Sequence, residues 1–387
     1  MTTLSPLPDS RHDAAAARRS NAAVPTSMIG RVGRFIDAAI VPLIVALACY
    51  LPLAHFAIAP SNPLHLSLFG INLIGQIICF ALLALALDLV WGYAGILSLG
   101  HGIFFGIGGY LMGIYLLNGA YQDTHVLPDF LQYMGASDFP RAWHIFARLD
   151  VTVLVTIITA AAIAGIFGFV TFRSRINGVY LSIITQALTY ALMLLLFIND
   201  IGLGGNNGMT GFTRIAGFRL ADVSTQIGLA VVSCLLLALA YLVVRAIVGS
   251  SFGRALVAVR DDEARMRFLG YRTPFIKLVA WCLSAVLAAL AGMLYVPQVG
   301  IVNPTIVSPQ LSVEIAVWVA IGGRGTLVGA IIGAIVVNGL KFWLTAQWPA
   351  VWPFILAGVT LAIVIRFGNG LWGAFKAAGD SAQGARH

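Results

Sequence analysis

The charged residues with the most informative spacing occupy one polar interval, residues 248–277, which separates two long apolar runs. Three consecutive acids in this interval are followed by two arginines and a glycine: Asp261, Asp262, Glu263, Arg265, Arg267 and Gly270. Acids stabilise the positive N-terminal end of a helix, arginines stabilise its negative C-terminal end, and Gly commonly follows the last turn. The pattern predicts a short helix over residues 261–269 that lies in water and is open to docking. An ordinary solvated loop is the alternative.

The composition of the whole chain indicates a membrane protein. Of the 387 residues, 59% are hydrophobic and 10% are charged, whereas a soluble domain carries about 25% charged residues. Several continuous apolar runs of about 18 residues or more are long enough to cross the ~30 Å hydrocarbon core of a bilayer as helices. We therefore expect an all-α, polytopic transmembrane helical bundle with about 8–10 spans and a short cytoplasmic coupling helix.

Ten segments of the sequence are candidates for these spans. Gly-rich sequence interrupts the apolar run in the third of them, and again between the eighth and the ninth. The candidates are 35–57, 71–90, 97–118, 149–172, 179–198, 225–246, 278–298, 312–323, 326–344 and 351–367.

The distribution of Lys and Arg predicts the orientation of the chain. Most of these residues lie between spans on the side that carries the N-terminus, and the positive-inside rule assigns that side to the cytoplasm. We expect a disordered, basic cytoplasmic tail at 1–34, a membrane domain at 35–370 with a cytoplasmic loop at 247–277, and a cytoplasmic C-terminal tail at 371–387.

Sequence motifs for enzymatic chemistry are missing. The cysteines lie singly within apolar segments, and the histidines form no cluster with metal-ligand spacing. A Walker A motif requires Gly-Lys, and each of Lys277, Lys341 and Lys376 follows a residue other than Gly. The basic residues are dispersed between spans, which argues against nucleic-acid binding. We expect no cofactor, no metal and no enzymatic activity in this chain.

Two Gly-rich stretches interrupt apolar runs and predict breaks in membrane helices. Gly92 and Gly95 begin the first, and Gly322, Gly323 and Gly325 form the second. Irregular backbone at membrane depth is tolerated only where it is buried in protein or lines a cavity. The two stretches are therefore candidates for the translocation path, with close helix packing through Gly as the alternative.

The residues alone leave three classes of function open. A permease subunit driven by a separate ATPase would explain both the missing P-loop and the polar interval. A stand-alone secondary transporter or channel would be expected to carry more buried ionisable groups along its path than this chain has. A membrane enzyme would require a catalytic constellation, and the sequence offers none.

Residues 253–295, GRALVAVRDDEARMRFLGYRTPFIKLVAWCLSAVLAALAGMLY, resemble the signature segment of permease subunits of branched-chain amino acid and urea ABC importers. The resemblance implies that this segment couples the permease to cytoplasmic ATPases through seven residues. These are Arg254, Arg260, Asp261, Asp262, Glu263, Arg265 and Gly270. The glycines from Gly322 to Gly325 match the family's Gly-Gly-x-Gly break, and the resemblance extends over about residues 35–370. The N-terminal tail and the end of the last span depart from the family pattern.

Three further segments, 88–116, 180–212 and 312–343, resemble the urea-type branch of this family more than its amino acid branch. The resemblance implies urea transport across the bacterial inner membrane, with branched-chain amino acids or short amides as the alternative. It also implies a second homologous permease subunit, two cytoplasmic ATPases and a periplasmic substrate-binding protein as partners, with lipid around the spans and both termini in the cytoplasm.

Urea is neutral and both donates and accepts hydrogen bonds, so its path would require mainly uncharged polar groups. The candidates are Ser98, His101, Gln186, Asn199, Asn206, Asn207, Glu314 and Trp318. An ionisable group inside a membrane is a functional candidate by default, which applies to His101 and to Glu314. For Glu314 the alternative is a carboxylate that reaches the outer interface.

Overall fold

The structure is a computed structural model, and it describes residues 28–59, 61–62, 64–135, 138–174, 176, 178–351, 354–355, 357–358 and 361. Most of the predicted tail at 1–34, most of the predicted span at 351–367 and the whole predicted tail at 371–387 lie outside these residues. Helix α2 begins at Met28, so the end of the predicted N-terminal tail is helical.

Eight helices in the described part of the chain are long and apolar enough to cross a membrane. They are α2 (Met28–Phe56), α3 (Leu68–Asp88), α4 (His101–Thr124), α6 (Leu149–Arg173), α7 (Val179–Phe197), α8 (Val223–Gly249), α11 (Thr273–Val299) and α13 (Leu327–Gln347). The predicted all-α polytopic bundle is confirmed. The predicted span at 312–323 corresponds instead to α12 (Pro309–Gly322), whose 14 residues reach only about 21 Å and are too short to cross alone.

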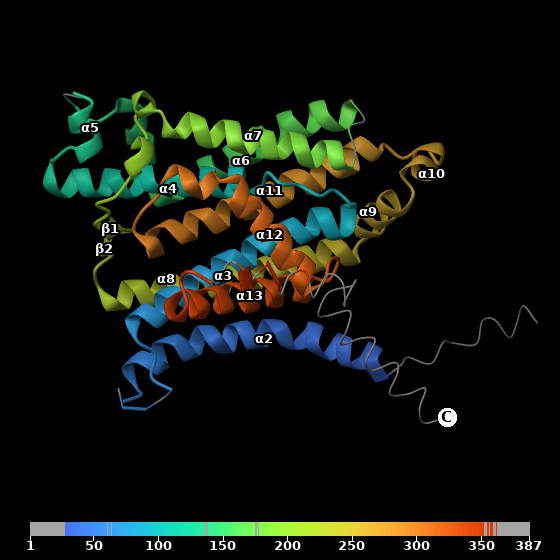
Figure 1. Cartoon of the computed structure of the whole chain (residues 1–387), viewed down its shortest axis with the longest axis horizontal. Coiled ribbons are helices and arrows are strands. Elements are labelled where there is room, and N and C mark those ends of the chain that lie inside the picture. The colour runs from blue at the N-terminus through green and yellow to red at the C-terminus, as the bar shows by residue number, and fades with distance from the viewer. Residues whose placement is uncertain are drawn as a thin grey trace, which may run out of the picture.

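The remaining elements lie mainly at the two ends of the bundle (Figure 1). One end carries α5 (Asp129–Tyr133) and a hairpin of β1 (Arg214–Ile215) with β2 (Phe218–Arg219), and is called the α5 end below. The opposite end carries α9 (Ser251–Asp261) and α10 (Glu263–Phe268), and is called the α9 end.

The centre of the bundle is formed by α3, α4 and α11, and the outer helices pack around them. Almost every residue of α3 from Ile77 onwards is buried, and α3 is apolar on all sides, as expected of a central helix. By contrast, α6 and α7 bury only a small part of their surface and leave large apolar side chains exposed. Those faces are available to lipid or to another subunit.

Two glycines allow α4 and α11 to approach each other closely. A methyl group on Gly108 of α4 would overlap the carbonyl of Ala289, and one on Gly292 of α11 would overlap the carbonyl of Phe105. Small residues at such positions let helix backbones meet in membranes, where packing rather than water drives association.

A non-helical segment, residues 95–100, precedes α4 and takes several of its hydrogen-bond partners from α7. The Thr185 hydroxyl accepts from Leu99 N at 3.1 Å, Ser182 donates to the carbonyl of Leu97 at 2.8 Å, and Thr189 donates to the carbonyl of Leu99 at 3.2 Å. These hydroxyls supply the partners that irregular backbone requires within a membrane bundle.

The loop at 199–212 is attached to the segment that follows α11. Met209 and Val302 exchange two backbone hydrogen bonds, from Met209 N at 2.8 Å and from Val302 N at 3.0 Å. This pairing holds the loop, at the α5 end, against the segment that connects α11 to α12.

Candidate functional site

The polar interval folds as two short helices instead of one. Asp261 is the last residue of α9, and α10 begins at Glu263, so the predicted single helix over 261–269 is wrong at its start. Asp262 separates the two helices because its backbone is extended and its side chain caps α10 by accepting from Arg265 N at 2.9 Å. Asp, a favoured N-cap residue, therefore starts the second helix.

The predicted cap at the end of this interval is confirmed. Gly270 has a φ of +88° and follows the last turn of α10. Gly270 N donates to the carbonyl of Arg267 at 3.0 Å, and Tyr271 N donates to the carbonyl of Met266 at 3.1 Å. This is the Schellman arrangement, in which Gly adopts the left-handed conformation at low cost.

Glu263 anchors α10 to the beginning of α11. Its carboxylate accepts from the Thr273 hydroxyl at 3.0 Å and from Lys277 Nζ at 2.5 Å, and Arg267 Nη2 lies 3.3 Å away. Partial burial acts to raise the pKa of Glu263, but the hydrogen bond and charge of Lys277, assisted by Thr273 and Arg267, outweigh it and lower the pKa below its usual value. Glu263 is therefore a structural tie within the interval.

This lowered pKa predicts how stability depends on pH. The ties to Glu263 should contribute fully above the unfolded-state pKa of about 4.3, and the contribution should fall as pH drops through the lower folded-state pKa. We expect Glu263→Gln to lower the thermal unfolding temperature of the detergent-solubilised protein at pH 7. The difference from the unsubstituted protein should shrink as the pH is lowered below about 4. A difference that stays constant with pH would contradict the role of the charge.

Arg260 of α9 points into the bundle and contacts the first predicted break. Its Nη1 donates to the carbonyl of Gly92 at 2.7 Å. Gly92 lies in a short π-helical turn, η1 (Leu89–Tyr93), that ends α3. Gly95, with a φ of +74°, lies against the same side chain, because a methyl group there would be 2.7 Å from Arg260 Cγ. The predicted break at these glycines is confirmed.

The second predicted break meets the first at the α9 end. Asp88, the last residue of α3, accepts a hydrogen bond from Gly325 N at 2.7 Å. Arg324 donates to the carbonyl of Trp91 at 3.2 Å and lies 5.2 Å from the centre of its ring. We call the contacts of Arg260, Asp88 and Arg324 with the two breaks the junction.

The glycines of the second break have different reasons for being Gly. Gly322 ends α12, and a methyl group there would overlap the carbonyl of Gly329 in α13, so it permits close packing. Gly323 and Gly325 have φ of +123° and +74° and form the turn between the two helices. Both interpretations of the Gly-rich sequence, turn and packing, therefore apply within one stretch.

Charge at the junction is concentrated on two neighbouring arginines. Burial, followed by the positive charge of Arg260, lowers the pKa of Arg324, while the charge of Asp88 acts in the opposite direction. The charge of Asp88 thus offsets part of the effect that the charge of Arg260 has on Arg324.

Three predicted path residues lie in the packed interior instead of at a cavity. His101 Nε2 is 2.7 Å from Ser284 Oγ, which donates to the carbonyl of Ala86 at 2.5 Å. Since the Ser284 proton is already donated, His101 donates from Nε2. Trp318 is buried with its ring 5.1 Å from that of Phe80. The buried Ser98 hydroxyl accepts from Gly100 N at 3.2 Å, within the segment held by α7.

Glu314 is paired across α12 and α13. Lys341 Nζ is 2.8 Å from Glu314 Oε2, and Gln310 donates to Glu314 Oε1 at 3.3 Å. This ion pair joins the two helices and accounts for the carboxylate without a role in the path. Gln186 of α7 is half-buried and lies outside the cavity described next.

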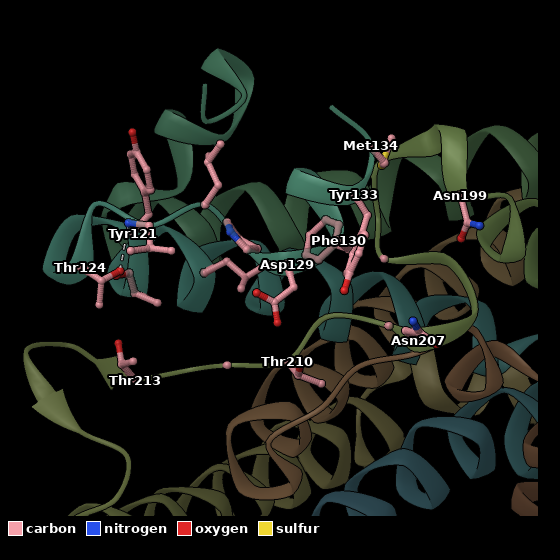
Figure 2. Close-up of a pocket in the computed structure, with 18 of the residues that line it drawn as sticks. Tyr121, Thr124, Asp129, Phe130, Tyr133, Met134, Asn199, Asn207, Thr210 and Thr213 are labelled. Carbon is pink, nitrogen blue, oxygen red and sulfur yellow. Dashed lines mark hydrogen bonds between the residues drawn. The ribbon is translucent and has the colours of Figure 1, made fainter. Parts of the chain in front are cut away.

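A cavity of about 1030 Å³ opens at the α5 end (Figure 2). It lies between the end of α4 with α5 on one side and the loop at 199–213 on the other, and Asn199 and Asn207 line it. Asn206 is exposed and is not among the lining residues. The other aromatic and polar residues that line the cavity are not among the predicted path residues: Tyr121, Thr124, Asp129, Phe130, Tyr133, Asp200, Thr210 and Thr213.

Other residues that position the site were not identified from the sequence. The hydroxyls of Ser182, Thr185 and Thr189 recur at three- and four-residue intervals on one face of α7, a helical spacing that predicts a polar stripe. The partner of Asp88, Gly325 N, lies 237 residues away, and no local pattern could indicate it.

Together, the apolar bundle and its capped polar segment define an integral membrane protein whose breaks are tied to an exposed segment. The chain belongs to the family described as branched-chain amino acid transport system / permease component, whose model matches residues 69–365. Membership of this family makes the chain a transport component.

Individual relatives give the same class. The chain is 28% identical over 305 residues to the high-affinity branched-chain amino acid transport system permease protein LivM of Salmonella typhimurium, covering 73% of this chain and 65% of the relative. The Escherichia coli protein of the same name is 28% identical over 304 residues, with the same coverage of 73% and 65%. The autoinducer 2 import system permease protein LsrC of Salmonella paratyphi B is 30% identical over 158 residues, 39% of this chain and 46% of the relative.

The chain thus spans 65% of the length of the LivM proteins that it matches. No solved structure matches the chain. None of these three relatives is named for urea, so the predicted urea specificity is not supported, and the alternative of branched-chain amino acids agrees better with their names.

Proposed function

We propose that this chain is the permease subunit of an ATP-driven importer of the bacterial inner membrane, with branched-chain amino acids as its substrates. The observation that carries the proposal is the exposed α9–α10 segment, which is hydrogen-bonded to the first helix break, while that break is in turn tied to the second. A partner that moves this segment would act directly on the irregular backbone of the bundle. The names of the LivM relatives support the choice of substrate.

The α9–α10 segment has the character of a docking surface for an ATPase. Large apolar side chains are exposed at its end: Phe268 at 93%, Leu269 at 64%, Tyr271 at 53% and Phe275 at 63%. Arg254 and Arg265 of the same segment are also exposed. An apolar patch rimmed by charge is typical of a protein interface. A partner would change the equilibrium of the bundle only by preferring one of its arrangements.

The cavity at the α5 end supports a substrate larger than urea. Its volume of about 1030 Å³ and its aromatic residues Tyr121, Phe130 and Tyr133 suit a side chain with apolar surface. Asn199 and Asn207 could hydrogen-bond polar groups of the substrate. In the proposed assembly a second homologous permease, two ATPases and a substrate-binding protein complete the importer, and both termini of this chain lie on the α9 side, in the cytoplasm.

Uptake measurements test the proposal. The importer, assembled from this chain with its partner ATPases, second permease and substrate-binding protein, is placed in proteoliposomes with ATP inside or outside. We expect uptake of labelled leucine that requires ATP on the α9 side, is competed by isoleucine and valine, and is unaffected by urea. Uptake without ATP would contradict the importer, whereas ATP-dependent uptake of urea that leucine does not inhibit would contradict the amino acid assignment.

A further inference from the structure

We propose that Arg260 is a positioning residue that joins the docking segment to both helix breaks, so that a movement of α9 displaces the π-turn at Gly92 and the turn at 323–326 together. The inference rests on the proposed function, because a partner ATPase would supply the movement. It assigns to Arg260 a role inside the permease, in place of the contact with the ATPase that the sequence predicts.

The Arg260 side chain extends from α9 toward the first break. Although Arg260 lies in the last turn of α9, its Nη1 is 2.7 Å from the carbonyl oxygen of Gly92. Its Cγ lies against Gly95, and its Nη1 is 3.8 Å from the position that a methyl group on Gly325 would occupy. One side chain therefore contacts both glycines of the first break and lies near Gly325 of the second.

The two breaks are also tied to each other by hydrogen bonds. Asp88 accepts from Gly325 N at 2.7 Å, and Arg324 donates to the carbonyl of Trp91 at 3.2 Å. Asp88 and Trp91 belong to the end of α3 and its π-turn, whereas Arg324 and Gly325 belong to the turn between α12 and α13. Displacing either break alone would require both bonds to part.

The other arginines of the segment lie differently. Arg265 pairs with Asp262 at 3.5 Å, and its side chain is 79% exposed. Arg254 is exposed and donates to the carbonyl of Gly249, the last residue of α8, at 3.4 Å. The Arg260 side chain is 33% exposed and also pairs with Asp261 at 3.0 Å. The position of its side chain, and not its charge alone, distinguishes Arg260 from Arg254 and Arg265.

The close approach of the two breaks requires Gly at position 92. A methyl group there would lie 2.6 Å from Gly325 N and 2.7 Å from Gly325 Cα, so the two turns are in direct backbone contact. The last carbonyls of a helix lack donors within the helix, and the guanidinium of Arg260 supplies one to Gly92. Rigid contacts of this kind transmit a displacement, because packed backbone cannot absorb it by a change of rotamer.

The experiment compares ATP hydrolysis with transport in the complete importer in proteoliposomes. For Arg260→Gln we expect substrate imported per ATP hydrolysed to fall about tenfold, the size of a typical coupling between sites, while hydrolysis stays within about twofold. Arg260→Lys, which retains a charged donor for the Gly92 carbonyl, should recover much of the ratio. Arg173→Ala is the matched control, because Arg173 lies at the same end but stacks on Phe169 of its own helix, 5.6 Å from the ring centre.

A second pair of variants keeps the test decisive if Arg260→Gln yields little folded protein. Asp88→Asn retains the oxygen that accepts from Gly325 N and should preserve the ratio, whereas Asp88→Ala removes it and should uncouple transport. Equal losses of hydrolysis and uptake in Arg260→Gln, or an unchanged ratio, would overturn the inference while the unsubstituted importer remains active. An unsubstituted importer without ATP-driven uptake would overturn the proposed function and this inference with it.

Discussion

Replacing Gly292 with Ala is expected to destabilise the bundle, although Ala is normally the better helix residue. The added methyl group would overlap the backbone carbonyl of Phe105, which cannot move aside by a change of rotamer. Overpacking of this kind costs about 1–3 kcal/mol, more than the ~0.5–1 kcal/mol that Ala usually gains over Gly in a helix. Thermal unfolding of the purified protein in detergent measures the difference.

Gly228→Ala is the matched control for this prediction. Gly228 lies within α8, is exposed, and has no heavy atom within 4 Å of the position of an added methyl group. It should unfold at the same temperature as the unsubstituted protein or slightly above it. If Gly292→Ala behaves in the same way, α4 and α11 do not approach as closely as described.

Replacing Gly208 with Ala is expected to detach the loop at 199–212 and to reduce transport about tenfold or more, which corresponds to about 1.4 kcal/mol. Gly208 has a φ of +71°, and a methyl group on it would overlap the carbonyl of Val302. That carbonyl accepts from Met209 N in the pairing that attaches the loop. The loop lines the cavity at the α5 end, so its release should disturb the cavity as well. Limited proteolysis reports the release, and uptake reports its effect on transport.

Gly211→Ala separates this contact from backbone strain. Gly211 has a φ of +81°, so Ala is strained there by about 1–3 kcal/mol, but no heavy atom lies within 4 Å of the added methyl group. We expect Gly211→Ala to lower stability modestly and to leave the loop protected from protease. Equal exposure of the loop in both variants would show that strain, and not the lost pairing with Val302, is responsible.

Much of the bundle could be predicted from the sequence because apolar length and charge are local properties. The spans at 149–172 and 179–198 match α6 and α7 almost residue for residue. The helix at 312–323 was predicted to cross the membrane because its apolar sequence is typical of a span. Its packing beside α13, which the sequence does not show, accommodates a shorter helix. The start of α10 was misplaced because Asp261 and Asp262 are chemically alike, and only the extended backbone of Asp262 distinguishes them.

The candidate site was predicted in part. Residues whose conformation depends on their sequence neighbours were identified, and residues whose partners lie far along the chain were not. Gly92, Gly95, Gly323 and Gly325 were identified because turns depend on the residues within them. His101 and Trp318 were assigned to a path because polar groups in membranes are usually functional, but their partners Ser284 and Phe80 belong to distant helices. The aromatic residues of the cavity, Tyr121 of α4 with Phe130 and Tyr133 of α5, were not identified because only the folded chain brings them opposite the loop at 199–213.

The dependence of residues 95–100 on α7 has a consequence for the order in which the chain enters the membrane. The hydroxyls of Ser182, Thr185 and Thr189 follow the backbone groups that they serve by 85, 86 and 90 residues. During synthesis the irregular segment therefore emerges well before its partners exist. Until α7 is made, water or the insertion machinery must satisfy those groups, because hydrocarbon cannot. The end of α3 and the start of α4 can take their final places in the bilayer only after α7 arrives.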